Sequence, residues 1–247
     1  MISAVILTKN SEKTITKTLN SLKRFDEIII VDNGSIDKTI EISEKFSNVK
    51  IIHESFIGFG PLRNLGAKFA KNDWILAIDS DEILSKELID EMKKEVLDEN
   101  FVYFFPFKNF YNEKHIKWCG WYPDFHPRLY NKNMTKFCDS KIHEKVITKN
   151  LKIKYFKNSI HHYSYRSIDD FLDKMKIYSN LFANQNKKRL KSSYKKAIFH
   201  SFFAFFKSYF LKRGFLDGGE GVLISYYNAN VAFYKYLKLL EEIKKCS

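Results

Sequence analysis

The sequence lacks the two glycine-rich signatures that are most typical of nucleotide-binding enzymes. No Gly-x-Gly-x-x-Gly follows the first apolar segment at residues 2–8, so we do not expect a dinucleotide cofactor. No Gly-x4-Gly-Lys-Ser/Thr occurs in the chain, which argues against P-loop phosphoryl transfer. A nucleotide, if one binds, must be held by another kind of site.

Long apolar runs and ordered cysteine spacings are missing as well. No apolar run approaches the roughly 18–20 residues that a membrane-spanning helix needs. Residues 1–10 have the pattern of a strand and lack the basic start of a signal peptide. The three cysteines, Cys119, Cys138 and Cys246, form an odd number without metal-binding spacing. We therefore expect a cytoplasmic protein in a reducing compartment, with inert thiols.

The chain of 247 residues contains no internal repeat and no disordered linker, but its charge is uneven. The net charge is +13. Residues 1–150 carry 23 Lys and Arg against 22 Asp and Glu, whereas residues 151–247 carry 19 against 7. A basic segment of this kind is typical of proteins that bind an anionic membrane, a nucleic acid or a phosphorylated substrate. A solubilising lysine surface is the alternative interpretation.

Residues 1–98 alternate short apolar segments with amphipathic ones. The patterns predict strands at 2–8, 27–31, 49–53 and 74–79, and helices at 11–22, 37–46, 62–70 and 83–97. This alternation predicts a mostly parallel sheet with helices on both faces. The pattern then changes, with a strand at 101–106, an aromatic irregular region, a short strand at 128–130, and strand or loop at 142–146 and 154–162. From residue 167 the chain is predicted to be helical, with interruptions at 212–214 and 217–221.

Four polar clusters follow the predicted strands of the first part. They are residues 8–10 (Thr-Lys-Asn), 32–35 (Asp-Asn-Gly-Ser), 60–64 (Gly-Pro-Leu-Arg-Asn) and 79–82 (Asp-Ser-Asp-Glu). Each cluster alone is also typical of a turn or a helix cap, and residues 80–82 directly precede the predicted helix 83–97. In an open α/β sheet, however, the carboxyl ends of the strands form the edge at which ligands bind. Four such clusters on one edge predict a binding site there.

The residue types of these clusters suit a nucleotide diphosphate. Asp32 can accept a hydrogen bond from a base or a ribose hydroxyl, and Arg63, near a helix start, can hold a pyrophosphate. Asp79 and Asp81 can offer oxygens to Mg²⁺ or Mn²⁺, which would bridge the two phosphates. The sequence therefore predicts a metal-dependent nucleotide site.

The order of these motifs resembles the family 2 glycosyltransferases with the GT-A fold. The matching segments are 6–10 (Ile-Leu-Thr-Lys-Asn), 31–39 (Val-Asp-Asn-Gly-Ser-Ile-Asp-Lys-Thr), 63–64 (Arg-Asn) and 79–81 (Asp-Ser-Asp). The family's usual Asp-Asp-Gly-Ser is Asp-Asn-Gly-Ser here, a variant that looks like the WaaE-type β-glucosyltransferases of lipopolysaccharide core synthesis. Later segments match that subgroup too: 122–124 (Tyr-Pro-Asp), 128–130 (Arg-Leu-Tyr), 143–144 (His-Glu), 162–165 (His-Tyr-Ser-Tyr) and 214–221 (Gly-Phe-Leu-Asp-Gly-Gly-Glu-Gly).

The resemblance implies an inverting, metal-dependent transfer of a hexose, such as glucose, from a UDP-sugar to a bacterial surface glycolipid. It places Asp81 and His162 on the metal, with His161 as the alternative to His162. The residues that it implies for the nucleotide sugar are Thr8, Asn10, Asp32, Arg63, Asn64 and Asp79.

An inverting transfer needs a base that takes the proton of the attacking hydroxyl. Glu144 is our candidate, because it follows a short apolar element and stands beside His143, which would tune or orient it. Asp124 and Asp139 are rival bases, and a role for Glu144 as an ordinary surface acid is the alternative.

The acceptor site is expected to be aromatic and basic. Trp121 and Tyr122, beside Trp118, would stack on sugar rings, and Arg128 would pair with phosphate or carboxylate. The tract 192–213 spaces aromatic residues along a helix flanked by lysines, which is typical of a helix at an anionic membrane surface and also of a helix packed on its own domain. We therefore expect a peripheral protein at the inner face of the bacterial inner membrane.

These expectations divide the chain into three functional parts. Residues 1–98 form the nucleotide-sugar half of a GT-A domain, 99–166 its acceptor half, and 167–247 a basic helical extension. A sugar-nucleotide nucleotidyltransferase is the alternative enzyme, but the segment 8–12 lacks the glycines which that class needs. A non-catalytic membrane- or nucleic-acid-binding module is the remaining alternative, although no nucleic-acid-binding motif is present and we expect no nucleic-acid partner.

Overall fold

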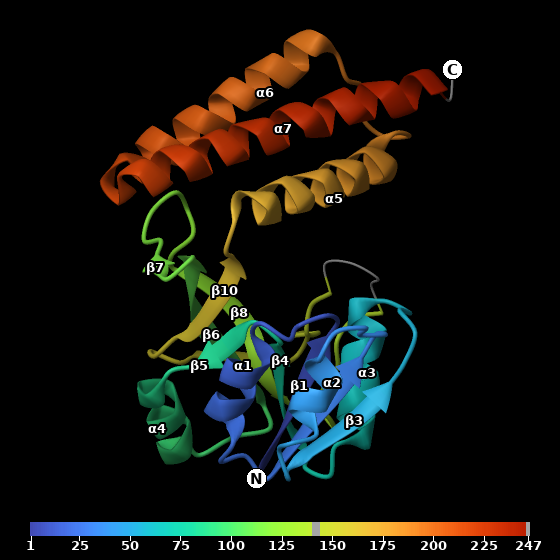
Figure 1. Cartoon of the computed structure of the whole chain (residues 1–247), viewed down its shortest axis with the longest axis vertical. Coiled ribbons are helices and arrows are strands. Elements are labelled where there is room, and N and C mark those ends of the chain that lie inside the picture. The colour runs from blue at the N-terminus through green and yellow to red at the C-terminus, as the bar shows by residue number, and fades with distance from the viewer. Residues whose placement is uncertain (140–143, 246–247) are drawn as a thin grey trace. The chain divides into compact units, whose positions relative to one another are not determined.

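The computed structural model of the protein describes residues 1–139 and 144–245 (Figure 1). The chain divides into two compact units. The first comprises Met1–Phe107 and Phe125–His162, and the second comprises Lys108–Asp124 and Tyr163–Ser247. The segment 108–124 thus groups with the C-terminal helices, so the compact units do not follow the boundaries at residues 98 and 166 that we expected between functional parts.

The first unit is organised by four parallel strands: β1 (Ile2–Thr8), β2 (Glu27–Asp32), β3 (Val49–His53) and β4 (Trp74–Asp79). Their order in the sheet is β3-β2-β1-β4. The sheet continues beyond β4 through β8 (Asp124–Asn131), which pairs antiparallel with β4, and then through β6 (Phe101–Tyr111), β10 (Ile160–Tyr165) and β5 (Glu82–Leu84). The predicted α/β fold with a mostly parallel sheet is confirmed.

Helices cover both faces of this sheet because alternate residues of its strands are apolar on both sides. Ala4 and Ile6 pack with α1 (Ile15–Leu22), α2 (Thr39–Ser43) and α4 (Lys86–Lys94). Val5 and Leu7, which point to the other face, pack with α3 (Phe59–Phe69). Burial on both faces explains why β1, β2 and β4 are near-continuous apolar runs in the sequence.

Helix α3 approaches the sheet closely at Gly66. A Cβ atom at this position would lie 2.4 Å from Cγ1 of Val5, so the helix can sit this close only with glycine there. Arg63 is one turn earlier on the same face of α3 and is therefore buried as well, with 2% of its surface exposed. The packing of α3 thus directs a guanidinium group toward the carboxyl edge of the sheet.

The predicted helix at 83–97 is wrong in its first turn. Residues Glu82–Leu84 form β5, which pairs antiparallel with β10 so that Glu82 lies opposite His162. Helix α4 begins only at Lys86, and the N-cap is Ser85, whose side chain accepts a hydrogen bond from the backbone N–H of Leu88 at 3.2 Å. The pairing with a distant strand, which the local pattern does not contain, decides the conformation of these residues. The expected caps at 80–82 are therefore not caps of α4.

The later strands are longer than the sequence predicted. Strand β6 runs to Tyr111 and β8 begins at Asp124, while β7 (Lys114–His115) and β9 (Lys152–Tyr155) pair with β6. Of the expected strand or loop at 142–146, residues 142 and 143 lie outside the described residues. Val146 forms an isolated antiparallel bridge with Phe137.

The second unit is mainly helical. Helix α7 (Gly219–Lys245) packs against both α5 (Ile168–Asn186) and α6 (Tyr194–Phe206), and lies between them in Figure 1. A π turn at Lys207–Leu211 (η1) and a 3-10 turn at Gly214–Asp217 (η2) connect α6 to α7. The helical extension is confirmed, with an additional break at 187–193 and with 219–221 inside α7. None of the helices in the described part of the chain is both long and apolar enough to cross a bilayer.

Candidate functional site

The parallel register aligns the ends of three strands on one edge. Thr8, the last residue of β1, is paired with Asp32 at the end of β2, and Asp79 at the end of β4 is paired with Leu7. The three polar side chains therefore come from neighbouring strands, with Asp79 one residue short of the level of Thr8 and Asp32. This arrangement is the one that the order of strands and polar clusters predicted.

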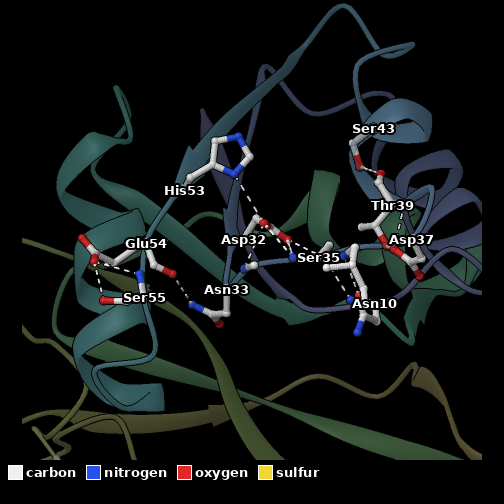
Figure 2. A network of polar contacts seen from close by, with 12 residues as sticks. Asn10, Asp32, Asn33, Ser35, Asp37, Thr39, Ser43, His53, Glu54 and Ser55 are labelled. Carbon is white, nitrogen blue, oxygen red and sulfur yellow. Dashed lines mark hydrogen bonds and ion pairs between the residues drawn. The ribbon is translucent and has the colours of Figure 1, made fainter.

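A buried aspartate organises the turn after β2. The carboxylate of Asp32 accepts hydrogen bonds from the backbone N–H groups of Gly34 and Ser35, each at 3.1 Å, and from the hydroxyl of Ser35 (Figure 2). Gly34 has a φ of 84°, which glycine adopts without strain. Asp32 thus shapes the turn with its own carboxylate, and its predicted contact with a base remains a prediction.

The loops after β1 and β2 form one continuous wall. The backbone N–H of Asn10 donates to the hydroxyl of Ser35 at 2.9 Å, and the Asn10 side-chain oxygen accepts from the backbone N–H of Ile36 at 2.9 Å (Figure 2). His53, which the sequence analysis missed, places Nδ1 3.3 Å from Oδ2 of Asp32. Only its position at the end of β3 pointed to it. Two loops separated by 25 residues in sequence are therefore held as a single surface.

Thr8 has a buried hydroxyl group without a hydrogen-bond partner in the described residues. A buried hydroxyl without a partner costs free energy, so such groups are often satisfied by a bound molecule or water. This observation supports the predicted place of Thr8 in the nucleotide pocket.

A chain of ion pairs is centred on Asp79. Oδ1 of Asp79 accepts a hydrogen bond from Nη2 of Arg63 at 2.6 Å, and Oδ2 accepts from Nη2 of Arg128 at 3.0 Å. The same Nη2 atom of Arg128 also donates to Glu82, whose other carboxylate oxygen accepts from the backbone N–H of Asp79 at 3.0 Å. Arg128, which we expected at the acceptor, is therefore paired directly with the predicted donor-site acid.

Burial and the neighbouring charges shift the pKa values of Asp79 and Glu82 in opposite directions. Burial raises the pKa of Asp79, but the guanidinium groups of Arg63 and Arg128 outweigh burial and hold it well below its usual range. Glu82 is fully buried, and burial together with the nearby Asp79 raises its pKa to about 7 against the opposing effect of Arg128. Asp79 therefore remains a carboxylate while it is held by two fixed cations.

Glu144, which is distant from Arg63 in sequence, forms a further ion pair with it. Its Oε1 accepts a hydrogen bond from Nε of Arg63 at 3.3 Å. A cavity of about 540 Å³ is lined by Arg63, Asp79, Arg128 and Glu144, together with aromatic residues that include Phe104 and Phe125. The predicted base and the predicted donor residues therefore share one cavity in the first unit.

Neither rival base is among the described residues that line this cavity. The side chain of Asp139 is 74% exposed, and its Oδ2 atom lies 3.9 Å from Nζ of Lys136. Asp124 is the first residue of β8 and belongs to the second unit. His143, the predicted partner of Glu144, lies outside the described residues. Glu144 is thus the candidate that the structure places with Arg63 and Asp79.

Asp81 and His162 lie side by side, as predicted for a metal site. Oδ2 of Asp81 is 3.6 Å from Nε2 of His162, because the pairing of β5 with β10 places His162 opposite Glu82. His161 is paired with Ile83 and by alternation faces the other side of the strand. Burial lowers the pKa of His162, but the carboxylate of Asp81 more than offsets this, so the net shift is upward.

The donor set at this corner fits a divalent cation. A carboxylate oxygen and an imidazole nitrogen are ligands that Mn²⁺ accepts, and a carboxylate alone suits Mg²⁺. In the described parts of the chain, no group of three or more His, Cys, Asp or Glu side chains forms a metal site by itself. Further ligands would have to come from a bound substrate.

Other predicted site residues have structural roles in the described residues. The side-chain amide of Asn64 donates to the carbonyl of Phe137 and accepts from its N–H, each at 2.9 Å, and so fixes the 137 segment against α3. Trp121 stacks on Tyr165 at 5.2 Å between ring centres in the second unit. Tyr122 lines a separate cavity of that unit. Arg128 is the predicted acceptor residue that lies in the cavity with Glu144.

Comparisons with known proteins agree with this fold. The sequence model described as "Glycosyl transferase family 2" matches residues 3–158. An uncharacterized glycosyltransferase of Rickettsia conorii is 32% identical over 261 residues, which cover 99% of this chain and 91% of the relative. The poly(ribitol-phosphate) beta-N-acetylglucosaminyltransferase TarS of Staphylococcus aureus is 36% identical over 113 residues, 38% of this chain and 20% of TarS. The crystal structure of S. aureus TarS 1–349 in complex with UDP-GlcNAc shares the fold, with a TM-score of 0.50 at 18% identity, covering 98% and 89% of the chains.

We predict that Arg128→Met lowers the free energy of unfolding by about 1–3 kcal/mol, because it leaves the fully buried carboxyl group of Glu82 without its hydrogen-bond donor. The double variant Arg128→Met/Glu82→Leu should recover part of this loss, since it removes that carboxyl group as well. Urea unfolding at pH 7 measures both effects. Lys136→Met removes a charge from an exposed side chain and serves as the control, with an expected change within about 0.5 kcal/mol. A loss below about 1 kcal/mol for Arg128→Met would contradict the importance of the pair.

Proposed function

Because the chain belongs to glycosyl transferase family 2, we propose that its site transfers a hexose, such as glucose, from a UDP-sugar to a bacterial surface glycolipid with inversion. Membership of the family makes the protein a transferase. It also argues against the two alternatives, a nucleotidyltransferase and a non-catalytic binding module. The observation that carries the finer proposal is the series of linked ion pairs Glu144–Arg63–Asp79–Arg128. This series joins a candidate base to the donor edge of the sheet.

The donor is proposed to bind across the carboxyl edge of the sheet. The unsatisfied hydroxyl of Thr8 and the wall formed by Asn10 and Asp32 would contact the base and ribose. Nη1 of Arg63 is buried and has no hydrogen-bond partner within the described residues, so one N–H direction of this guanidinium is available for a phosphate oxygen. The relative TarS, which was solved with UDP-GlcNAc, supports a UDP-linked donor.

Asp81 and His162 are proposed to hold Mg²⁺ or Mn²⁺, with the donor diphosphate completing the ligand set. When bound, such an ion would offset the negative charge that builds on the departing diphosphate. Arg63 supplies a fixed positive charge at the same edge, because Asp79 and Glu144 hold its guanidinium from two sides. Fixed charges of this kind need little rearrangement during the reaction.

Glu144 is proposed as the base of a single displacement. The acceptor hydroxyl oxygen attacks the anomeric carbon, the bond from that carbon to the diphosphate breaks, and the hydroxyl proton passes to the Glu144 carboxylate. UDP then leaves with the electron pair of the broken bond. The hydrogen bond from Nε of Arg63 fixes the orientation of the carboxylate, so that it is positioned before the acceptor arrives.

The acceptor is proposed to be a glycolipid of the lipopolysaccharide core type. This proposal rests on the resemblance of the segments 122–124, 128–130 and 214–221 to the WaaE-type subgroup. Trp121, Tyr122 and Arg128 remain the candidate acceptor residues. The role of residues 99–166 as an acceptor half of the domain is part of the same proposal.

An anionic membrane surface is proposed as the partner of the second unit. Helix α6 and the following turn expose several large apolar side chains, with Phe199 65%, Phe202 70% and Leu211 61% exposed. The segment 174–216 contains 11 Lys and Arg residues and no Asp or Glu. Exposed aromatic residues beside a run of cations are typical of helices that lie in a bilayer interface. We accordingly place the enzyme at the cytoplasmic face of the inner membrane.

We predict that UDP raises the thermal unfolding temperature of the protein only when Mn²⁺ or Mg²⁺ is present. Asp81→Asn should abolish this metal-dependent increase, because it removes the candidate carboxylate ligand. At a ligand concentration of about 100 times Kd, the stabilisation of the wild type amounts to about 2.7 kcal/mol. The control Asp139→Asn removes an exposed carboxylate and should leave the increase unchanged. Equal stabilisation of Asp81→Asn and the wild type would refute the metal assignment.

Glu144→Gln should lower kcat by roughly 100-fold or more while leaving stabilisation by UDP and metal nearly intact, because the amide keeps the Arg63 contact but cannot take a proton. Turnover is measured as UDP release from the nucleotide sugar that stabilises the enzyme most, with a bacterial glycolipid extract as acceptor. Asp139→Asn is again the matched control. Near-normal turnover of Glu144→Gln would exclude Glu144 as the base.

For the membrane proposal, we predict that the protein sediments with vesicles of phosphatidylglycerol and phosphatidylcholine, and less with phosphatidylcholine alone. Phe199→Gln/Phe202→Gln should lower the partition coefficient at least about tenfold, since each buried Phe side chain contributes about 1.5–3 kcal/mol. Phe56→Gln/Phe69→Gln, which changes two exposed rings of the first unit, is the control. Equal partition of both double variants and the wild type would reject α6 as the membrane contact.

A further inference from the structure

The second unit contains a cavity of about 410 Å³ that the glycosyl-transfer site does not use. One wall is the loop that carries Lys117, Trp118 and Tyr122, and the other is the turn that carries Lys212 and Arg213. Its size falls within the range of about 300–1,000 Å³ that is usual for small-molecule sites. All of its lining residues belong to the second unit.

The cavity is strongly cationic. Lys117, Lys212 and Arg213 line it, and no Asp or Glu does. In the described part of the chain, none of these three side chains forms an ion pair, whereas the nearby Glu220 is paired with Lys114 at 2.6 Å. Three positive charges that face one small space without an internal counter-charge repel one another, and a bound anion would relieve this repulsion.

A buried acid holds one wall in place without neutralising the cavity. Asp217 accepts hydrogen bonds from the backbone N–H groups of Trp118 at 2.8 Å and Lys117 at 3.4 Å. Its carbonyl oxygen accepts from the ammonium group of Lys114 at 2.9 Å. The carboxylate is thus engaged by backbone groups of the wall, and it does not line the cavity.

The two walls are also joined directly. The backbone N–H of Cys119 donates to the carbonyl of Lys212 at 3.0 Å. A Cβ atom on Gly214 would lie 2.7 Å from Sγ of Cys119, so the turn packs tightly against the loop. The backbones of the two walls are therefore held together by direct contacts, which lowers the entropic cost of binding between them.

Arg213 is held in an unusual conformation that orients its guanidinium. Its φ is 54°, a left-handed value that costs free energy for a residue with a side chain. The guanidinium lies over the ring of Trp118, 5.6 Å from the ring centre, in a cation–π contact. Backbone strain of this kind clusters at binding sites, and a stacked arginine presents its N–H groups in a fixed plane.

We propose that this cavity binds the phosphate ester group of a saccharide or of a lipid headgroup. A guanidinium fork binds phosphate oxygens in a bidentate manner, and the two lysines add compact positive charges. The aromatic faces of Trp118 and Tyr122 offer contact to the ring or chain that carries the phosphate.

The exposed apolar residues beside the cavity are consistent with either source. Phe210, Leu211 and Phe215 adjoin the turn in sequence and are each about half exposed or more. A phosphate at a bilayer surface and a phosphate on a membrane-linked saccharide would both reach a cavity that is bordered by such residues. The proposed binding of phosphate does not depend on the proposed glycosyl transfer. Only the identification of the bound phosphate as part of the acceptor rests on that proposed function.

The test compares the wild type with Lys117→Gln/Lys212→Gln in two binding experiments on the full chain. The control is Lys244→Gln/Lys245→Gln, which makes the same change of net charge at exposed lysines of the same unit that neither line the cavity nor belong to the basic segment 174–216. Arg213→Asn is a second cavity variant, because asparagine tolerates positive φ and is expected to keep the turn. Circular dichroism and thermal unfolding establish that all variants are folded.

The first experiment titrates glucose 6-phosphate, with glucose as the reference, by calorimetry in the presence of saturating UDP and Mn²⁺. The second measures partition into vesicles of phosphatidylglycerol and phosphatidylcholine. In at least one of them we expect both cavity variants to bind at least about tenfold more weakly, with the control variant within about twofold of the wild type.

The two experiments also separate the sources of the phosphate. Weaker binding of glucose 6-phosphate by the cavity variants supports a saccharide phosphate as the ligand. A loss confined to the vesicles supports a lipid headgroup. If the cavity variants behave as the control variant in both experiments, the proposal is overturned. Loss of catalysis alone does not affect it, because both readouts measure binding.

Discussion

The first unit depends on how Asp79 is stabilised at the end of a buried strand. A carboxylate at this position is tolerated because Arg63 and Arg128 approach it from α3 and from β8. The close packing of Gly66 against the sheet sets the position of Arg63, and the antiparallel pairing of β8 with β4 sets that of Arg128. The two ion pairs of Asp79 therefore link the packing of α3 and β8 to the geometry of the site.

The same linked ion pairs support the catalytic proposal. Glu144 is fixed by Arg63, and Glu82 is held by Arg128 beneath the site. The short strand β5, which contains Glu82, pairs with β10 and brings His162 beside Asp81. The proposed base, donor edge and metal site are thus connected through fixed contacts, as preorganised electrostatic catalysis requires.

The second unit presents a different kind of surface. Its helices expose aromatic and basic side chains, and its cavity is lined by three cations without an acid. Glycosyl transfer to a membrane glycolipid requires both a soluble donor site and contact with an amphiphilic acceptor. The uneven charge of the sequence, nearly neutral in residues 1–150 and basic in 151–247, is consistent with the membrane contact that we propose for the second unit.

The sequence by itself determined the alternation of strands and helices, the polar clusters at the strand ends and the family. These follow from local periodicity and from short motifs, which need no knowledge of distant contacts. The tertiary structure decided which charges meet. It paired Arg128 with Asp79, used the amide of Asn64 to hold Phe137, and turned residues 82–84 from a predicted helix into a strand. Each of these outcomes depends on a partner tens of residues away, and a pairing over that distance leaves no local pattern in the chain.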